Sequence, residues 1–302
     1  MGEVRSTSEG AGGADGYRLV VAVGNPSYAS QLVRTAVDIA RANDGEVRIV
    51  TVVHKPRESP FSVFSDEAIR EEYAGDRREI LDRALEVAGD SVPVDGRLVV
   101  GTDVGRALRS FVREVDADAL LVGWHGRPRR DGIVLGSTID DVLRRAPCDV
   151  LVERIGPTAD GVERVLLPVA GGPHLPFAAS VADAIAGAND ASVRLLTVVG
   201  PGATDAERDD SRGVLEEAAG LLTAPSESRL AESASVEDAV LEAADDSDLV
   251  VFGATRRGPV RRRLIGSVPQ AVGRRSDRSV IVARRRPDRS VLDRVAGRLW
   301  DR

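Results

Sequence analysis

One glycine-rich segment near the middle of the chain has residue types and spacing suited to holding a phosphate. It begins with Gly123-Trp124-His125-Gly126, continues through nine residues, and ends with Gly136-Ser137-Thr138. Glycine has no Cβ, so Gly123 and Gly126 allow positive φ angles and a close approach of the backbone to a ligand. A helix that starts at Gly136-Ser137-Thr138 offers unpaired N–H groups and a favourable dipole to an anion, and both hydroxyls can donate to phosphate oxygens. The segment therefore predicts a phosphate-binding loop.

A turn and helix cap without a ligand is the alternative interpretation of this segment, and we favour binding. His125 is expected to be an exposed loop residue, as are His54 and His174, and Cys148 to be a small core residue. No Ser/His/Asp or Cys/His arrangement and no pair of carboxylates can be assembled from the sequence. The GxxxxGK[ST] motif is absent, which argues against a P-loop nucleotidase. We therefore expect binding rather than catalysis.

The elements around this segment alternate between apolar strands and amphipathic helices. An apolar run predicts a strand over Ala119–Gly123, and the pattern after the segment predicts a helix over Thr138–Arg145. The other expected strands are Leu19–Val23, Val47–Val53, Arg97–Val100 and Asp149–Glu153, and the other expected helices are Ala29–Ala42, Arg77–Ala88 and Val104–Val115. Strands joined by helices in this way form right-handed crossovers and a doubly wound parallel sheet. Ligands bind at the carboxyl ends of such strands, which is where the glycine-rich segment lies.

The same order of elements occurs twice in the chain. Val47–Val53 matches Val193–Val199, 146 residues later, and Asp118–Gly123 matches Asp248–Gly253, 130 residues later. The smaller offset means that the first copy carries extra residues in its middle, and Ser59–Gly75 is the long connection that holds them. The repeat predicts domains over 17–154 and 162–284 with a linker over 155–161. The small, polar residues 1–16 are expected to form a disordered leader. One apolar helical face near the end predicts a tail helix over 285–302, which we expect to dock on the protein's own body, with a position on a membrane surface as the alternative.

Composition excludes several classes of protein. The net charge of −7 argues against a duplex nucleic acid partner, because phosphate contacts need a basic face. A single cysteine allows no intramolecular disulfide and no cysteine zinc cluster, which fits a reducing cytoplasm. No apolar run approaches the roughly 20 residues that span a bilayer.

The glycine-rich segment resembles the nucleotide-binding motif of the universal stress protein family. In both, a strand ends in glycine and is followed by two residues, a second glycine, nine residues and then Gly-Ser. The strand order is similar too, and the resemblance covers about residues 17–154 and 162–284. It implies two tandem α/β domains of the five-stranded, adenine-nucleotide-hydrolase-like fold. It also implies that ATP or a similar adenine nucleotide, with or without Mg²⁺, is held by residues of the segment and by the backbone of the second strand. These residues are Val52, Gly123, Gly126, Gly136, Ser137 and Thr138.

The sequence departs from the family pattern at three places. The first strand of ATP-binding members usually ends in an aspartate that contacts the nucleotide, and Gly24 and Ala170 stand there in the two copies. This leaves the affinity and the identity of the base and sugar open. In the second copy Arg256 replaces the second motif glycine, so we expect that site to be weak or empty. The arginine-rich stretch Arg256–Arg263 is expected to be solvated or paired with surface carboxylates.

The hypothesis we favour is a cytoplasmic nucleotide-binding protein that acts in stress response or regulation, with one nucleotide per chain. Because members of this family commonly dimerise through their last strands, Asp149–Glu153 and Ser279–Ala283 are expected to join the domains as an intramolecular pseudo-dimer. A homodimer of whole chains is a further option. The alternative function is a nucleotide-free interaction module, for instance a regulatory partner of a transporter, and ATP hydrolysis is the weakest hypothesis.

Overall fold

The computed structural model describes residues 16–55, 65–72, 75–124, 128–129, 132–133, 137–154, 161–254 and 266–286. Four expected features lie largely or wholly outside these residues: the leader, the linker 155–161, the arginine-rich stretch 256–263 and the tail helix. Within the glycine-rich segment, His125, Gly126 and Gly136 also lie outside them. Gly123, Ser137 and Thr138 are described, so both ends of the segment can be placed.

Strands and helices alternate through both halves of the chain. The first half contains β1 (Arg18–Ala22), α1 (Pro26–Ala42), β2 (Glu46–His54), α2 (Asp66–Glu72), α3 (Gly75–Ala88), β3 (Val94–Gly101), α4 (Val104–Glu114), β4 (Ala119–Trp124), β5 (Pro128–Arg129), β6 (Gly132–Ile133), α5 (Ser137–Arg145) and β7 (Asp149–Arg154). The second half contains β8 (Arg164–Pro168), α6 (Leu175–Ala188), β9 (Ser192–Val199), α7 (Asp205–Ala219), β10 (Ser226–Glu232), α8 (Val236–Asp245), β11 (Leu249–Gly253), α9 (Ser267–Arg275) and β12 (Ser279–Arg284).

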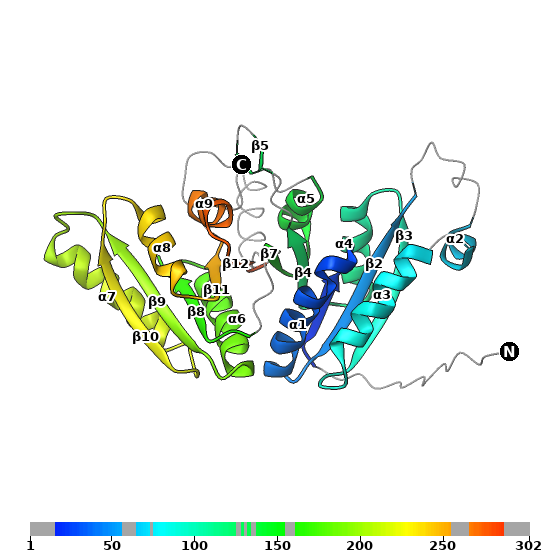
Figure 1. The fold of residues 1–302 in the computed structure, drawn as a ribbon, viewed down its shortest axis with the longest axis horizontal. Helices are drawn as coiled ribbons and strands as arrows, with labels where there is room; N and C mark the ends of the chain where they lie inside the picture. Colours follow the sequence, from blue (N-terminus) through cyan, green and yellow to red (C-terminus); the bar gives the residue numbers. More distant parts are fainter. Residues whose placement is uncertain are drawn as a thin grey trace, which may run out of the picture.

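The two halves form one continuous sheet of ten strands in the order β10-β9-β8-β11-β12-β7-β4-β1-β2-β3 (Figure 1). All neighbours within a half are parallel, whereas β7 and β12 pair antiparallel where the halves meet. This confirms the predicted pair of doubly wound, five-stranded domains and the pairing of their last strands. The chain order reverses between β1 and β4 and again between β8 and β11, and a crevice for a ligand is expected at each reversal.

Helix α1 shows how the sequence sets these elements. Its buried side chains recur every three or four residues and form the apolar face that packs on the sheet. The helix begins at Pro26, three residues before the predicted start at Ala29. The reason is local: the Asn25 side chain accepts a hydrogen bond from the Ser27 N–H at 2.9 Å, and proline fits the first helical position.

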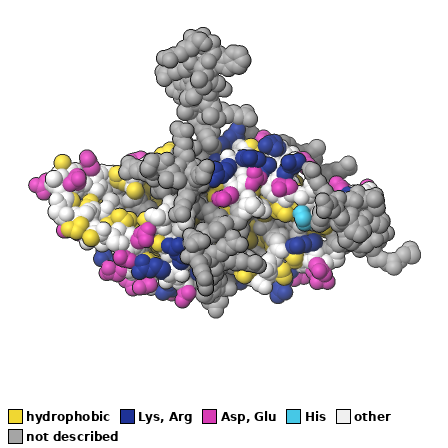
Figure 2. Space-filling view, turned by 90° about the horizontal axis from the view of Figure 1, so that it is seen from above, with side chains coloured by type: hydrophobic (Ala, Val, Ile, Leu, Met, Phe, Trp, Pro, Cys, Tyr) yellow, Lys and Arg dark blue, Asp and Glu magenta, His cyan; other side chains and the backbone are white. Residues whose placement is uncertain are grey.

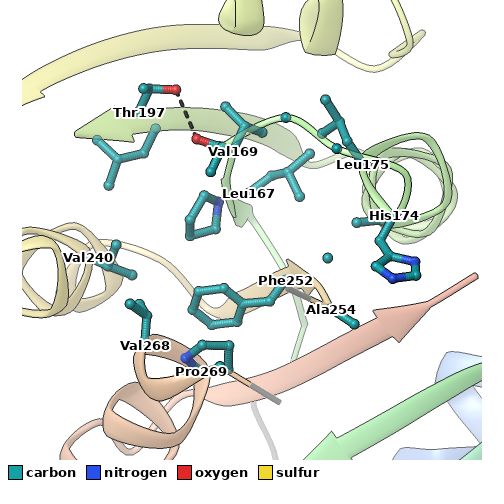
Figure 3. Close-up of a pocket in the computed structure, with 18 of the residues that line it drawn as sticks. Leu167, Val169, His174, Leu175, Thr197, Val240, Phe252, Ala254, Val268 and Pro269 are labelled. Atoms are coloured by element: carbon teal, nitrogen blue, oxygen red, sulfur yellow. Dashed lines mark hydrogen bonds between the residues drawn. The ribbon is translucent and has the colours of Figure 1, made fainter. Parts of the chain in front are cut away.

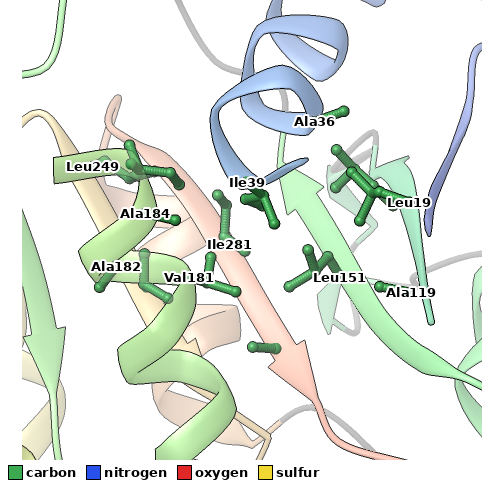
Figure 4. Packing of buried hydrophobic residues seen from close by; sticks show 14 of the residues in the cluster. Leu19, Ala36, Ile39, Ala119, Leu151, Val181, Ala182, Ala184, Leu249 and Ile281 are labelled. Carbon is green, nitrogen blue, oxygen red and sulfur yellow. The ribbon is translucent and has the colours of Figure 1, made fainter. Parts of the chain in front are cut away.

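The seam between the halves is closed by apolar packing on both faces of the sheet. On one face α1 lies beside α6, where alanines at several buried positions allow the two helices to approach. Figure 4 shows Ile39 of α1, Val181 of α6 and Ile281 of β12 around this seam. On the other face, β7, β12, α5 and α9 contribute to a second cluster that also runs across both halves. The halves therefore share their hydrophobic core.

The structure differs from the expected elements in the first half at two places. The connection over Ser59–Gly75 contains a short helix, α2, which packs against β3 through Ile69. Residues between the motif glycines, expected as a loop, include the small antiparallel pair of β5 and β6. None of the helices in the described part of the chain has the length and apolar character needed to cross a bilayer.

Candidate functional site

In the first half, the topology predicts the crevice where β1 and β4 end. Strand β1 stops at Ala22, and the next backbone contact is the Val23 N–H donating to the Val50 carbonyl at 2.9 Å. Gly24 follows and is exposed, and a Cβ built on it would meet no atom within 4 Å. The guanidinium of Arg77 on α3 donates to the Gly24 carbonyl at 2.7 Å. The end of β1 therefore has free space for a ligand beside a cation.

Val52 presents its backbone to the same crevice. Alternate residues of a strand direct their N–H and C=O groups to the same neighbouring strand. In β2 the Val50 carbonyl is bonded to β1, whereas the Lys55 N–H donates to Gly101 of β3. Val52 therefore faces the β1 side, beyond the point where β1 has ended. Its side chain is partly buried among core residues, so the backbone is the part available to a ligand.

The two described ends of the glycine-rich segment lie at the positions that the sequence predicts. Gly123 lies in β4, opposite Glu153 of β7, close to the carboxyl end of the strand. Ser137 is exposed and begins α5, with Thr138 after it, one residue earlier than the predicted start. Arg109 of α4 forms an ion pair with Asp141 of α5, which ties this helix to its neighbour. Ser137 and Thr138 thus lie in the first turn of α5, where N–H groups lack helical partners.

Two helices of the first half carry a cation in their first turn where their counterparts in the second half carry an acidic residue. The third residue of α3 is Arg77 and the third residue of α4 is Arg106, whereas α7 and α8 have Glu207 and Asp238 at that place. A cation in the first turn of a helix is disfavoured by the helix dipole, so these arginines do not help helix stability. Arg77, which lies beside Gly24 at the end of β1, favours an anionic ligand there. Figure 2, seen from above, shows basic side chains gathered beside the middle of the molecule.

The second half contains a well-defined cavity at its own crevice, with a volume of about 370 Å³. Figure 3 shows its mainly apolar walls, which include Val169, Leu175, Val240 and Phe252. Five of its lining residues occupy the positions that correspond to Val52, Gly123, Gly136, Ser137 and Thr138. These counterparts are Val198, Gly253, Gly266, Ser267 and Val268. The repeat thus brings five of the six predicted site positions together around one cavity, although in the half where we expected the weaker site.

His174, which was expected to be a loop residue, lies in the turn before α6 and lines this cavity. It precedes α6 directly and is buried, and its Nδ1 accepts a hydrogen bond from the Arg285 N–H at 3.1 Å. Gly171 and Gly172, with φ angles of +69° and +97°, form the turn that leads to it. Tyr28 stands at the matching place in the first copy, so the repeat gave no signal for a histidine here. His54, by contrast, is exposed at the end of β2.

Cys148 is buried, as expected of a core residue. Burial raises the pKa of its thiol to about 12, which the positive charge of Arg284 offsets only in part. At neutral pH the thiolate is therefore scarce, and the thiolate is the reactive form. In the described part of the chain, no three His, Cys, Asp or Glu side chains are grouped so that they could hold a metal ion.

Comparison with known proteins identifies one family and agrees with the fold described above. The model of the universal stress protein family matches residues 17–154 and again 161–284. A putative universal stress protein from Staphylococcus epidermidis is 30% identical over 138 residues, which is 45% of this chain and 82% of that protein. The match to this relative thus spans less than half of the chain, as expected for a protein with two copies of the domain.

Solved structures resemble both the whole chain and one half of it. A universal stress protein from Archaeoglobus fulgidus is 18% identical and covers 90% of this chain and 97% of its own, with a TM-score of 0.62, which shows the shared fold. The universal stress protein from Archaeoglobus fulgidus in complex with dAMP is 24% identical. It covers 45% of this chain and 96% of its own, with a TM-score of 0.34.

Proposed function

Because the chain belongs to the universal stress protein family, we propose that its first half binds ATP or a related adenine nucleotide between the ends of β1 and β4. One observation carries this proposal: the residues that match the predicted site positions line a single cavity in the second half. The first half has the same order of elements, and there Val52 belongs to β2, Gly123 to β4 and Ser137 to the first turn of α5, which supports the proposal.

The charges and donors favour the first half over the second. Arg77 lies beside Gly24 at the end of β1. In the second half, Val268 and Pro269 follow Ser267 where Thr138 and Ile139 follow Ser137. This removes a hydroxyl donor, and proline removes one N–H donor as well. A nucleotide phosphate would therefore find fewer partners at the start of α9 than at the start of α5.

We propose that the bound nucleotide regulates an interaction in the cytoplasm rather than undergoing turnover. The protein would supply backbone donors and two hydroxyls, and Mg²⁺ would arrive with the phosphates of ATP. The alternative is a nucleotide-free interaction module, favoured by Gly24 and Ala170 in place of the aspartate of ATP-binding members. Binding of a partner that is unaffected when nucleotide is removed would favour the alternative.

A pair of matched serine variants tests the location of the site. Ser137→Ala should weaken ATP binding by about tenfold or more, because a hydrogen bond to a charged phosphate contributes about 1.5–3 kcal/mol. Ser267→Ala, at the corresponding position of the second half, should leave the affinity unchanged. Calorimetric titration of the full chain with ATP and Mg²⁺ measures both. A loss confined to Ser267→Ala would place the nucleotide in the second half and contradict the proposal.

A further inference from the structure

A second cavity, of about 290 Å³, lies where the two halves meet, away from both crevices. We call it the seam cavity. Its polar lining comes from α1, β7, β12 and α6, and includes Gln31, Thr35, Asp38, Glu153, Asn189 and Ser279. Apolar side chains of both halves, among them Val37, Ile185 and Leu249, complete its walls. It therefore combines polar groups with space for a small hydrocarbon.

Glu153 is the side chain that most needs a partner in this cavity. It is 1% exposed, and its Oε1 accepts a hydrogen bond from Gln31 Nε2 at 2.6 Å. Its Oε2 is buried and accepts no hydrogen bond from the residues that the structure describes. Burying a carboxylate oxygen without a donor is costly, and the cost is larger when the group is charged.

Gln31 adds a second unsatisfied acceptor beside the first. Its amide nitrogen donates to Glu153 Oε1 and, at 2.8 Å, to Ser279 Oγ, so its donors are engaged. Its Oε1 is buried and has no donor among the described residues. Two lining residues from two elements therefore each carry a buried acceptor that has no donor among the described residues.

The other charged groups of the seam cavity are engaged elsewhere or lie at its edge. Asp38 accepts a hydrogen bond from Asn189 at 3.1 Å and pairs with Arg41. Asp248 accepts from the backbone N–H groups of residues 163 and 164, both at 2.9 Å. Arg34 lines the cavity but its side chain is exposed. Glu153 is thus the one lining carboxylate of the described residues with a buried oxygen that has no donor.

We propose that the seam cavity binds a small alkylammonium ion, whose N–H groups donate to Glu153 Oε2 and Gln31 Oε1 while its alkyl chain contacts the apolar walls. A positive charge offsets the cost of burying an ionised carboxylate, which a neutral donor does not. The volume is about ten times the space that one water molecule occupies in the liquid, so a bare inorganic cation would leave most of it unfilled. Such a ligand would bridge both halves of the chain.

The test uses n-butylammonium as the probe. The control n-butanol has a similar shape without the charge, and the control K⁺ has the charge without the alkyl chain. The full chain should show a higher Tm with millimolar n-butylammonium at pH 8 and a smaller shift with n-butanol or K⁺. Glu153→Gln should weaken binding by about tenfold or more, the effect of losing a hydrogen bond to a charged group. Glu242→Gln, an exposed carboxylate on α8, is the matched control and should bind as the wild type does.

The pH dependence of n-butylammonium binding can be measured on the unmodified chain. Burial raises the pKa of Glu153 to about 7. The other charged residues that line the cavity are Arg34, Asp38 and Asp248. The n-butylammonium shift should therefore fall between pH 8 and pH 6 as Glu153 takes up a proton. Equal shifts with n-butanol, equal shifts with K⁺, or binding that is independent of both pH and Glu153 would each overturn the proposal.

Discussion

Gly24 is the residue at which this chain departs from the nucleotide-binding members of its family in the first half. The structure shows that the departure concerns the side chain and not the backbone, because open space surrounds the position and its φ lies outside the left-handed region. Arg77 already places a guanidinium beside it. A carboxylate could therefore be accommodated there without rearrangement.

Gly24→Asp should strengthen binding of adenine nucleotides by about tenfold, because it restores a charged hydrogen-bond acceptor at the end of β1. Gly24→Ala is the control for adding a Cβ and should change the affinity by less than about twofold. Titration calorimetry with ATP and AMP measures both variants. An unchanged affinity for Gly24→Asp would show that the nucleotide does not approach this strand end.

Glu153 makes stability depend on pH in a predictable direction. Burial is the main cause that raises its pKa from 4.5 to about 7, and the nearby polar side chains of Gln31 and Thr35 oppose the shift. Between these two pH values the folded chain holds more protons than the unfolded chain, so stability falls as pH rises through this window. The full loss is about 3 kcal/mol, at about 1.4 kcal/mol per pKa unit.

Glu153→Gln removes this titration and keeps an oxygen that can accept from Gln31. Its Tm relative to wild type should rise by several degrees between pH 5 and pH 8, in buffer free of amines. Glu242→Gln should show the same difference from wild type at both pH values. A Glu153→Gln profile parallel to that of the wild type would mean that the buried carboxyl is not shifted.

Residue types with a defined local role could be predicted from the sequence, and residues whose role depends on distant partners could not. Gly123 and Ser137 were predictable because the spacing between them follows from one strand, one turn and one helix. The seam cavity was not predictable, since Ser279 of the second half reaches Gln31 and Glu153 of the first only when the two halves pair. His174 was missed because its partner, the Arg285 N–H, lies 111 residues away.

At the scale of elements, helix α9 of the second half packs against strand β4 of the first. A Cβ on Gly273 would lie 3.2 Å from the Trp124 ring, which is tighter than nearly all such contacts. Trp124 is fully buried and lies in the glycine-rich segment, directly after Gly123. The close approach of α9 therefore favours a glycine at position 273 and packs against one end of the predicted phosphate loop.

Gly273→Val should destabilise the chain by about 1–3 kcal/mol, because the added methyl groups overlap Trp124. Gly187→Val is the matched control, since Gly187 lies in α6 and a Cβ there would meet nothing within 4 Å. Its effect should stay within about 0.5 kcal/mol. Thermal unfolding followed by circular dichroism compares the two, and equal destabilisation would show that α9 does not pack on Trp124 this closely.

The elements themselves were largely predictable because each strand or helix carries its own apolar period. The strands of the first half and the helices α1, α3, α4 and α5 lie where the pattern predicts, with ends that move by a few residues. Caps explain part of the difference, as Asn25 and Pro26 do for α1. The helix α2 was missed because the seven residues Asp66–Glu72 carry too few apolar positions to show a period.

At the scale of the whole molecule, the duplicated fold supports two crevices that are not equal. The repeat in the sequence predicts two domains, and the antiparallel pairing of β7 with β12 joins them into one sheet. In the first half, α3 and α4 carry Arg77 and Arg106 in their first turns, whereas α7 and α8 carry acidic residues at the matching positions. The duplication has therefore preserved the architecture while the chemistry of the two halves has diverged.

The most direct measurement is a calorimetric titration of ATP into the full chain and into two variants that exchange the motif residues of the halves. The wild type should bind one nucleotide per chain, and Gly126→Arg, which copies Arg256 into the first half, should abolish this binding. Arg256→Gly should leave the first site intact. Absence of binding to the wild type, or binding that survives Gly126→Arg, would contradict a nucleotide site in the first half.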